Sequence, residues 1–234
     1  MTSARERAAP PAAGNVLVVF ARYPEPGRVK TRLARAVGEA AASALYAAFV
    51  EDLRRRFAAT TFAVRWAVAP PDPGFAARFS IPGPDVFLQK GEDLGARMRN
   101  AIAATLGQGF TRCAIVGSDM PQLGLETVVD AFAQLDEADL VLGPADDGGY
   151  YLIAARTPVN VFDGIAWGTD TVRAATRERA RALGLRTALL EHGFDVDVAA
   201  DLVRLRELLE DPRARAAMPA TAAALAGLVS TTSP

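Results

Sequence analysis

NVLVVFARYPEPGRVKTRLA, residues 15–34, is the stretch that decides the fold of this chain. It opens with an apolar run, Asn15–Ala21, of the kind that forms a strand buried on both faces. A Pro-Glu-Pro-Gly turn follows, and three cations, Arg28, Lys30 and Arg32, then precede a helix. Positive charge at a helix N-terminus opposes the helix dipole, which favours carboxylates there. We therefore expect the turn to bind an anion, the alternative being a solvated basic start to a surface helix.

Outward from this stretch, β-type runs alternate with helical patterns. This alternation predicts an α/β fold with three layers, α/β/α, around a mostly parallel Rossmann-like sheet. Strands are predicted at 15–21, 62–69, 85–89, 112–119, 138–144, 149–155 and 186–190, and helices at 38–58, 93–106, 124–135, 170–183 and 199–210.

One domain is expected over residues 15–210. Residues 1–14 are predicted to be a disordered tail, because they show no apolar pattern. Residues 211–234 are rich in Ala, Pro, Ser and Thr, and we expect a C-terminal tail there that is either a loose helix or frayed.

The composition of the chain excludes several classes of function. The 234 residues carry a formal net charge of −1, so no global basic field would hold nucleic acid or an anionic membrane. A single Cys and a single His exclude a His/Cys zinc site within one chain. No apolar run approaches the roughly 18 residues of a spanning helix, and the first residues are not a secretory signal. We expect a cytoplasmic protein that uses neither nucleic acid nor membrane.

Ligands of such sheets bind at the carboxyl ends of the strands, so the residues that follow each strand deserve scrutiny. After the first strand, backbone N–H groups of the turn and the cationic heads can cradle a polyphosphate. The residues concerned are Gly27, Arg28, Lys30, Thr31 and Arg32. Further along, Gln89 and Gly95 could touch a base or sugar, although Asp93 between them is as well explained as a helix cap.

Carboxylates follow two other predicted strands. Asp119 ends a central strand before Pro121, and Asp195 and Asp197 alternate in an extended segment, so both of the latter can point the same way. Three such carboxylates predict a Mg²⁺ (or Mn²⁺) site. The structural alternatives are that Asp119 caps the next helix and that Asp197 or Asp201 caps the last one.

The segment GPADDGGYYLI, residues 143–153, combines two acids with a Gly-Gly turn. Glycine lets the backbone approach a ligand closely, although Asp-Gly-Gly is also a hairpin signal. Trp167 could stack on a ring or simply pack. We predict an acceptor pocket formed by Asp146, Asp147, Gly148, Gly149, Tyr150, Trp167 and Thr169.

Six segments together resemble a known family: FARYPEPGRVKTRLA, QKGEDLGARM, GSDMP, GPADDGGYYLI, IAWGTDTV and DVDVAADL. They are similar to the rSAM/selenodomain-associated transferase 1 family, whose members are usually described as glycosyltransferases. The resemblance covers residues 15–210 and implies the nucleotide-diphospho-sugar transferase (GT-A) fold.

The chain also resembles, more distantly, guanylyltransferases that act on phospholactate or phosphoenolpyruvate. This resemblance implies that Lys30 and Arg32 bind a nucleoside triphosphate, and that the three carboxylates hold the metal. Arg22 stands where the family commonly has Lys, which keeps a cation with a different geometry. Ser118, Met120 and Gly168 also depart from the usual residues, but none of these changes removes a proposed metal ligand.

Two enzymatic hypotheses follow, and a third is not enzymatic. In nucleotidyl transfer a phosphate or phosphonate acceptor attacks a nucleoside triphosphate, with Lys30, Arg32 and Asp119 as catalytic residues. In glycosyl transfer a nucleotide-sugar donates its sugar, and Asp146 or Asp147 would serve as base. GT-A enzymes usually carry Asp-x-Asp after the central strand, and the single Asp119 here favours nucleotidyl transfer. A non-catalytic nucleotide-binding subunit is the third hypothesis, and the oligomeric state, a homodimer included, stays open.

Overall fold

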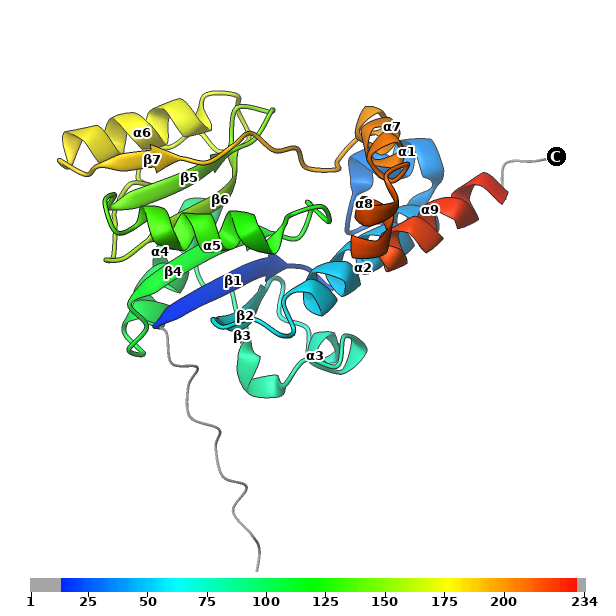
Figure 1. The fold of residues 1–234 in the computed structure, drawn as a ribbon, viewed down its shortest axis with the longest axis horizontal. Coiled ribbons are helices and arrows are strands. Elements are labelled where there is room, and N and C mark those ends of the chain that lie inside the picture. The colour runs from blue at the N-terminus through cyan, green and yellow to red at the C-terminus, as the bar shows by residue number, and fades with distance from the viewer. Residues whose placement is uncertain (1–13, 231–234) are drawn as a thin grey trace, which may run out of the picture.

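The computed structural model describes residues 14–230, and a central sheet runs through this part of the chain (Figure 1). The expected N-terminal tail therefore lies almost wholly outside the described residues. The strands are β1 (Asn15–Ala21), β2 (Ala63–Val68), β3 (Val86–Leu88), β4 (Arg112–Gly117), β5 (Leu140–Pro144), β6 (Tyr150–Ala155) and β7 (Thr187–Leu189).

The strands lie in the order β3-β2-β1-β4-β6-β5-β7. Within the described part, β6 pairs antiparallel with both neighbours, and the other pairs are parallel. The predicted mostly parallel sheet is confirmed. After β1 the chain adds β2 and β3 on one side and then returns to place β4 on the other, so a topological switch point lies between β1 and β4.

Helices cover both faces of the sheet. They are α1 (Thr31–Val37), α2 (Glu39–Arg56), α3 (Gly74–Arg78), the 3₁₀ turn η1 (Gly83–Asp85), α4 (Leu94–Leu106), α5 (Leu125–Gln134), α6 (Val172–Ala182), α7 (Ala199–Leu208), α8 (Pro212–Ala217) and α9 (Pro219–Ser230). α3 and η1 were not expected from the sequence.

The side chains of β1 alternate between the two faces of the sheet, and this alternation shows how the layers form. Leu17 and Val19 are buried in one core with α2 and α5, while Val16 and Val18 are buried in a second core with α4 and α6. Successive strand side chains point to opposite faces, so a continuous apolar strand needs a helical layer on each side. The three-layer α/β/α architecture is confirmed.

The described part of the C-terminal segment is helical, as one of the two expectations had it, but it is packed rather than loose. Figure 1 shows α7, α8 and α9 gathered beside α1 and α2, beyond the end to which β1 points. Met218 and Leu225 are buried. The carboxylate of Asp52 in α2 accepts hydrogen bonds from the backbone N–H groups of Ala220 and Thr221, at 2.9 and 2.7 Å. This cap comes from a residue far away in sequence, so the composition of the segment could not reveal it.

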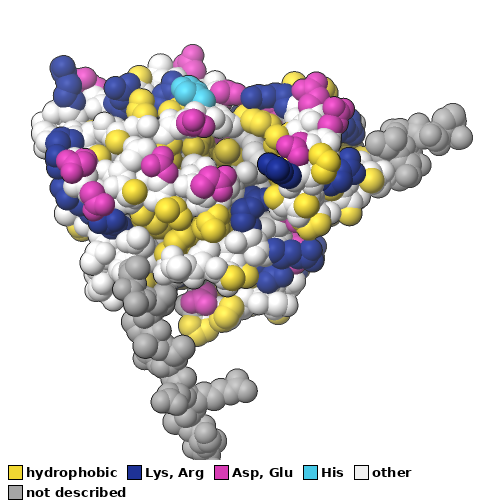
Figure 2. All heavy atoms as spheres, viewed as in Figure 1, with side chains coloured by type: hydrophobic (Ala, Val, Ile, Leu, Met, Phe, Trp, Pro, Cys, Tyr) yellow, Lys and Arg dark blue, Asp and Glu magenta, His cyan; other side chains and the backbone are white. Residues whose placement is uncertain are grey.

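The surface carries mixed charge. On the face drawn in Figure 2, Lys and Arg side chains alternate with Asp and Glu rather than forming one continuous basic field. No helix in the described part of the chain is both long and apolar enough to cross a membrane.

Candidate active site

A cavity of about 560 Å³ opens at the carboxyl ends of β1 and β4, at the switch point of the sheet. Open α/β sheets bind their ligands at such a point, and the volume suits a small molecule. Most of the predicted site residues line it: Arg22, Arg28, Lys30, Thr31, Arg32, Gln89, Asp119, Asp147, Gly149, Tyr150, Trp167, Thr169, Asp195 and Asp197.

Lys30 lies at the centre of the predicted anion-binding turn. It precedes α1 with left-handed backbone angles, φ 48° and ψ 41°, which residues other than glycine adopt rarely. Its side chain is only 3% exposed, whereas Arg22, Arg28 and Arg32 remain exposed. Arg28 pairs with Glu25 at 3.2 Å. The turn thus contributes one buried cation and two accessible ones, and Arg22, directly after β1, adds a third accessible cation.

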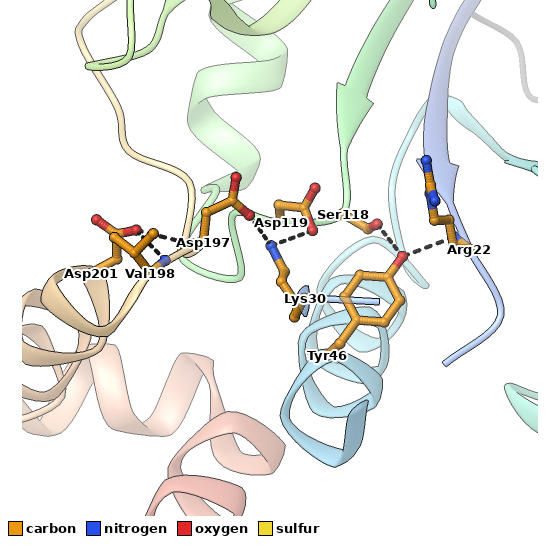
Figure 3. A network of polar contacts seen from close by, with 8 residues as sticks. All are labelled: Arg22, Lys30, Tyr46, Ser118, Asp119, Asp197, Val198 and Asp201. Carbon is orange, nitrogen blue, oxygen red and sulfur yellow. Dashed lines mark hydrogen bonds and ion pairs between the residues drawn. The ribbon is translucent and has the colours of Figure 1, made fainter. Parts of the chain in front are cut away.

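The buried ammonium joins two of the predicted metal ligands. Lys30 Nζ lies 2.5 Å from Asp119 Oδ1 and 2.7 Å from Asp197 Oδ1 (Figure 3). Asp119 follows β4, and the backbone N–H of Val196 donates to the Asp119 carbonyl at 2.9 Å. The turn after β1, the loop after β4 and the segment before α7 therefore meet at one point.

The electrostatics of this cluster are dominated by its acids. Burial lowers the pKa of Lys30, but the charges of Asp119 and Asp197 outweigh burial, so the pKa stays above its usual value. Burial, and after it the charge of Asp119, raise the pKa of Asp195 to about 7. One ammonium does not neutralise the three carboxylates, and a second cation would stabilise them.

The carboxylates are not arranged as a ready-made metal cage. Within the described residues, no three or more His, Cys, Asp or Glu side chains are placed to hold a metal ion in this conformation. Asp119 and Asp197 instead direct an oxygen each at Lys30. Mg²⁺ usually binds through one or two carboxylates and completes its shell with water and phosphate oxygens. The donor set therefore fits such an ion, and the assignment of Asp119, Asp195 and Asp197 as its ligands stays a prediction.

Of the alternative roles for the acids, one holds: Asp201 takes part in capping α7, whereas Asp119 does not cap α5. The residue that precedes α5 is Gly124, so Asp119 does not cap that helix. Asp201 accepts the backbone N–H groups of Asp197 and Val198, at 2.8 and 2.9 Å, and so fixes the segment that carries Asp197. Asp93 does cap α4, accepting from the N–H of Ala96.

Sequence reasoning missed a tyrosine beneath the cluster. Tyr46 Oη accepts the backbone N–H of Arg22 at 2.9 Å and lies 2.7 Å from Ser118 Oγ (Figure 3). Burial, and then the charge of Asp119, raise the pKa of Tyr46 to about 12, so the hydroxyl stays protonated. Tyr46 sits among apolar residues of α2, and only its periodicity was visible in the sequence. Arg97, which also lines the cavity, was missed as well.

Five of the seven residues predicted to form an acceptor pocket line the cavity, and two, Asp146 and Gly148, do not. Asp146 is not among the lining residues, because its carboxylate pairs with Arg204 of α7 at 2.9 Å. Gly148 does not line the cavity either. It adopts φ +87°, and a Cβ there would stand 2.0 Å from the carbonyl oxygen of Asp170. Asp147 does line the cavity and accepts the N–H of Gly149 at 2.8 Å.

Two predicted nucleotide-binding glycines have structural roles instead. A Cβ at Gly95 would lie 2.6 Å from the ring of Trp167, so this glycine lets α4 pack against the indole. Trp167 also contacts Phe162, with ring centroids 6.4 Å apart, and still lines the cavity. Gly27 supplies the positive φ of its turn, +76°, and is not a lining residue. Gln89 is anchored by its side-chain amide, which donates to the carbonyl of Ala67 at 2.7 Å.

The remaining His and Cys play no part in the cavity. His192 is exposed on a loop, and Cys113 is fully buried in β4. Burial raises the pKa of the Cys113 thiol to about 12, which keeps it unreactive.

The sequence of this chain matches a protein family and a named enzyme. The DUF2064 profile, described as an uncharacterized protein conserved in bacteria, matches residues 52–169. The phosphoenolpyruvate guanylyltransferase of Chloroflexus aggregans is 29% identical over 185 residues, which cover 76% of this chain and 89% of that protein.

Solved structures show the same fold. A protein of Desulfovibrio desulfuricans G20, provisionally described as a nucleotide-diphospho-sugar transferase, is 33% identical with a TM-score of 0.82, covering 92% of this chain and 98% of that one. A cytidylyltransferase from Leptospira borgpetersenii superposes with a TM-score of 0.52 at 10% identity, covering 85% of this chain and 87% of that one, and shows the fold alone.

Fold and relatives together define a transferase of the nucleotide-diphospho-sugar transferase (GT-A) type, either a nucleotidyltransferase or a glycosyltransferase. These matches agree with the resemblance found in the sequence. The chain belongs to the DUF2064 family.

Proposed function

We propose that this protein transfers a nucleotidyl group from a nucleoside triphosphate to a small phosphorylated or phosphonate acceptor. One observation carries the proposal: a turn with accessible cations faces a cluster of carboxylates across a single cavity. Cations suit a polyphosphate, and carboxylates suit the divalent ion that accompanies it. Both charges are needed when a phosphoryl centre is attacked and pyrophosphate departs.

The side chains take the following roles in this proposal. The β- and γ-phosphates are bound by Arg22, Arg28 and Arg32. Arg28 pairs with Glu25, whereas Arg22 and Arg32 form no ion pair within the described part of the chain and are free to bind phosphate. An acceptor phosphate oxygen attacks the α-phosphorus, and the bond from that phosphorus to the bridging oxygen breaks. Pyrophosphate leaves against the cations of the turn. A phosphate nucleophile is already ionised, so no general base is required.

Mg²⁺ or Mn²⁺ held by Asp119 and Asp197, with Asp195 beside them, would neutralise charge on the α-phosphate. Lys30 fixes both carboxylates in the protein without metal. Chelation with EDTA should abolish turnover, and either ion should restore it.

The relative from Chloroflexus aggregans suggests where to begin with substrates. That protein is named for guanylyl transfer to phosphoenolpyruvate. GTP and phosphoenolpyruvate are therefore the first donor and acceptor to test here. At 29% identity the base and the acceptor can both differ.

Glycosyl transfer is the second candidate, because the Desulfovibrio desulfuricans G20 relative is described as a nucleotide-sugar transferase. An acceptor hydroxyl would then need a base. Asp147 lines the cavity whereas Asp146 is paired with Arg204, so Asp147 is the residue left for that role. A non-catalytic nucleotide-binding subunit, a homodimer and a cytoplasmic location stay predictions of the sequence.

The test is ³¹P NMR of the purified protein with Mg²⁺ and a panel of donors. Nucleoside triphosphates and nucleotide-sugars are supplied separately, each with phosphoenolpyruvate and with a pool of other small phosphorylated acceptors. Pyrophosphate released from a triphosphate only when acceptor is present supports nucleotidyl transfer. Nucleoside diphosphate released only from a nucleotide-sugar supports glycosyl transfer. Binding of a donor with no turnover of any would indicate the non-catalytic subunit.

A further inference from the structure

The ammonium of Lys30 stands where two carboxylates converge on one cation. It contacts one oxygen each of Asp119 and Asp197, at 2.5 and 2.7 Å, and its side chain is 3% exposed (Figure 3). The two carboxylates are much more accessible, at 43% and 48%. The ring of Phe49 lies 5.9 Å from the ammonium on another side. The cation is thus enclosed while its acidic partners face the cavity.

We propose that Lys30 is a built-in counter-ion of this site, which competes with a divalent cation for the oxygens of Asp119 and Asp197. The inference rests on the proposed metal site, but it does not depend on which group the enzyme transfers.

The geometry explains why the two cations exclude each other. A Mg²⁺ ion needs ligand oxygens at about 2.0–2.1 Å in near-octahedral geometry. Both Oδ1 atoms already accept from the ammonium, so a metal that uses them must displace Lys30 or lie a few ångströms from it. Like charges at that separation repel strongly in a partly buried site. The absence of a ready three-ligand cage in the described residues is consistent with this competition.

Competition has a consequence for the order of binding. The displaced ammonium needs a new anionic partner, because a buried and unpaired charge is costly. A phosphate group that arrives with the metal provides that partner within the same turn. Metal alone should bind weakly, and metal with a polyphosphate should bind well.

The test is Mn²⁺ binding to the full-length protein without nucleotide, followed by the EPR signal of free Mn²⁺. Lys30→Met should bind Mn²⁺ at least about tenfold more tightly than the wild type, because a repelling charge at contact distance is removed. Lys30→Arg keeps the cation and should remain as weak as the wild type. Adding Asp119→Asn to Lys30→Met should abolish the gain. Arg32→Met is the matched control, since it removes a nearby cation that forms no ion pair within residues 14–230, and should change affinity less than threefold.

Thermal unfolding in EDTA checks that each variant folds. Should Lys30→Met not fold, Lys30→Gln carries the same expectation, because its neutral amide can still donate to the carboxylates. Equal Mn²⁺ affinity in wild type and the folded neutral variant would overturn the inference. So would a gain for Arg32→Met as large as that for Lys30→Met. Donor turnover is measured separately on the wild type, so failure of the competition and failure of the proposed function are distinguishable.

Discussion

The hydroxyl of Tyr46 connects the ends of two strands at the scale of single residues. It accepts the N–H of Arg22 after β1 and bonds with Ser118 after β4, next to Asp119. The side chain is 3% exposed, so water does not replace these bonds. The hydroxyl therefore fixes the spacing between the accessible cations and the carboxylates.

Replacing Tyr46 with Phe should destabilise the protein by about 1–3 kcal/mol, because the partly buried N–H of Arg22 and the buried hydroxyl of Ser118 lose their partner. Urea unfolding measures the change. Tyr23→Phe is the control, since the ring of Tyr23 packs on Arg78 and Tyr23 does not line the cavity. Its substitution should change the free energy of unfolding by less than about 0.5 kcal/mol. Equal changes in the free energy of unfolding for the two variants would show that the hydrogen bonds of the Tyr46 hydroxyl do not stabilise the protein.

The sequence was sufficient to locate most of the cavity residues but not their partners. Cations after one strand and acids after others must meet at one edge of a parallel sheet, which explains why Arg32 and Asp119 share a cavity. The bond between Lys30 and Asp197 spans 167 positions, and no local pattern encodes it. A tyrosine in an apolar helical face likewise gives no signal of its own.

At the scale of elements, the turn between β5 and β6 determines where α6 begins. Gly148 has φ +87°, and the N–H of Arg173 donates to its carbonyl at 3.0 Å. An added Cβ would lie 2.0 Å from the Asp170 carbonyl. The glycine is thus required twice, for its backbone angle and for the close approach.

Gly148→Ala should lower the free energy of unfolding by about 2 kcal/mol or more, because backbone strain and overpacking act together. Gly168→Ala separates the two causes, because Gly168 also has a positive φ, +81°, but nothing lies within 4 Å of its added Cβ. That variant should cost only about 1 kcal/mol. Denaturant titration measures the loss in free energy of unfolding for each variant. Equal losses would show that the close approach of Asp170 to Gly148 does not contribute.

Element boundaries were predictable where a periodic pattern met a turn signal, as for β1 and α4. The helix predicted over 170–183 starts later, at Val172, because the preceding residues pack around Gly148 instead of forming a helical turn. The Gly-Gly pair after Asp146 and Asp147 predicted a turn. It could not predict that only Asp147 lines the cavity, because Asp146 pairs with Arg204 of the later helix α7.

Over the whole molecule, Arg56 connects the C-terminal helices to the loop that follows β4. Its guanidinium donates to the carbonyls of Pro121 and Leu123, at 2.5 and 2.7 Å, and to that of Ala217 at 2.8 Å. Pro121 and Leu123 lie two and four residues after Asp119, and Ala217 ends α8. The segment expected to be a loose helix or a frayed tail is thus held to the loop that carries Asp119.

Arg56→Met should lower stability by about 2–4 kcal/mol, because three carbonyls lose a charged donor. It should also lower turnover, because the loop with Asp119 loses two anchors. Arg55→Met is the matched control: Arg55 pairs with Glu51 at an exposed position, and its loss should cost less than about 0.5 kcal/mol. Thermal unfolding and pyrophosphate release report the two effects, and a variant as stable as the control would contradict the support role.

The most direct test of the account follows two labels in one reaction. The protein is given its active nucleoside triphosphate labelled with ³²P at either the α- or the γ-phosphorus, together with acceptor and Mg²⁺, and the products are separated. Nucleotidyl transfer predicts that the α label enters the acceptor product and that the γ label appears in pyrophosphate. In Asp119→Asn neither labelled product should form. An α label left in a nucleoside diphosphate, or label transfer that persists in Asp119→Asn, would contradict the account.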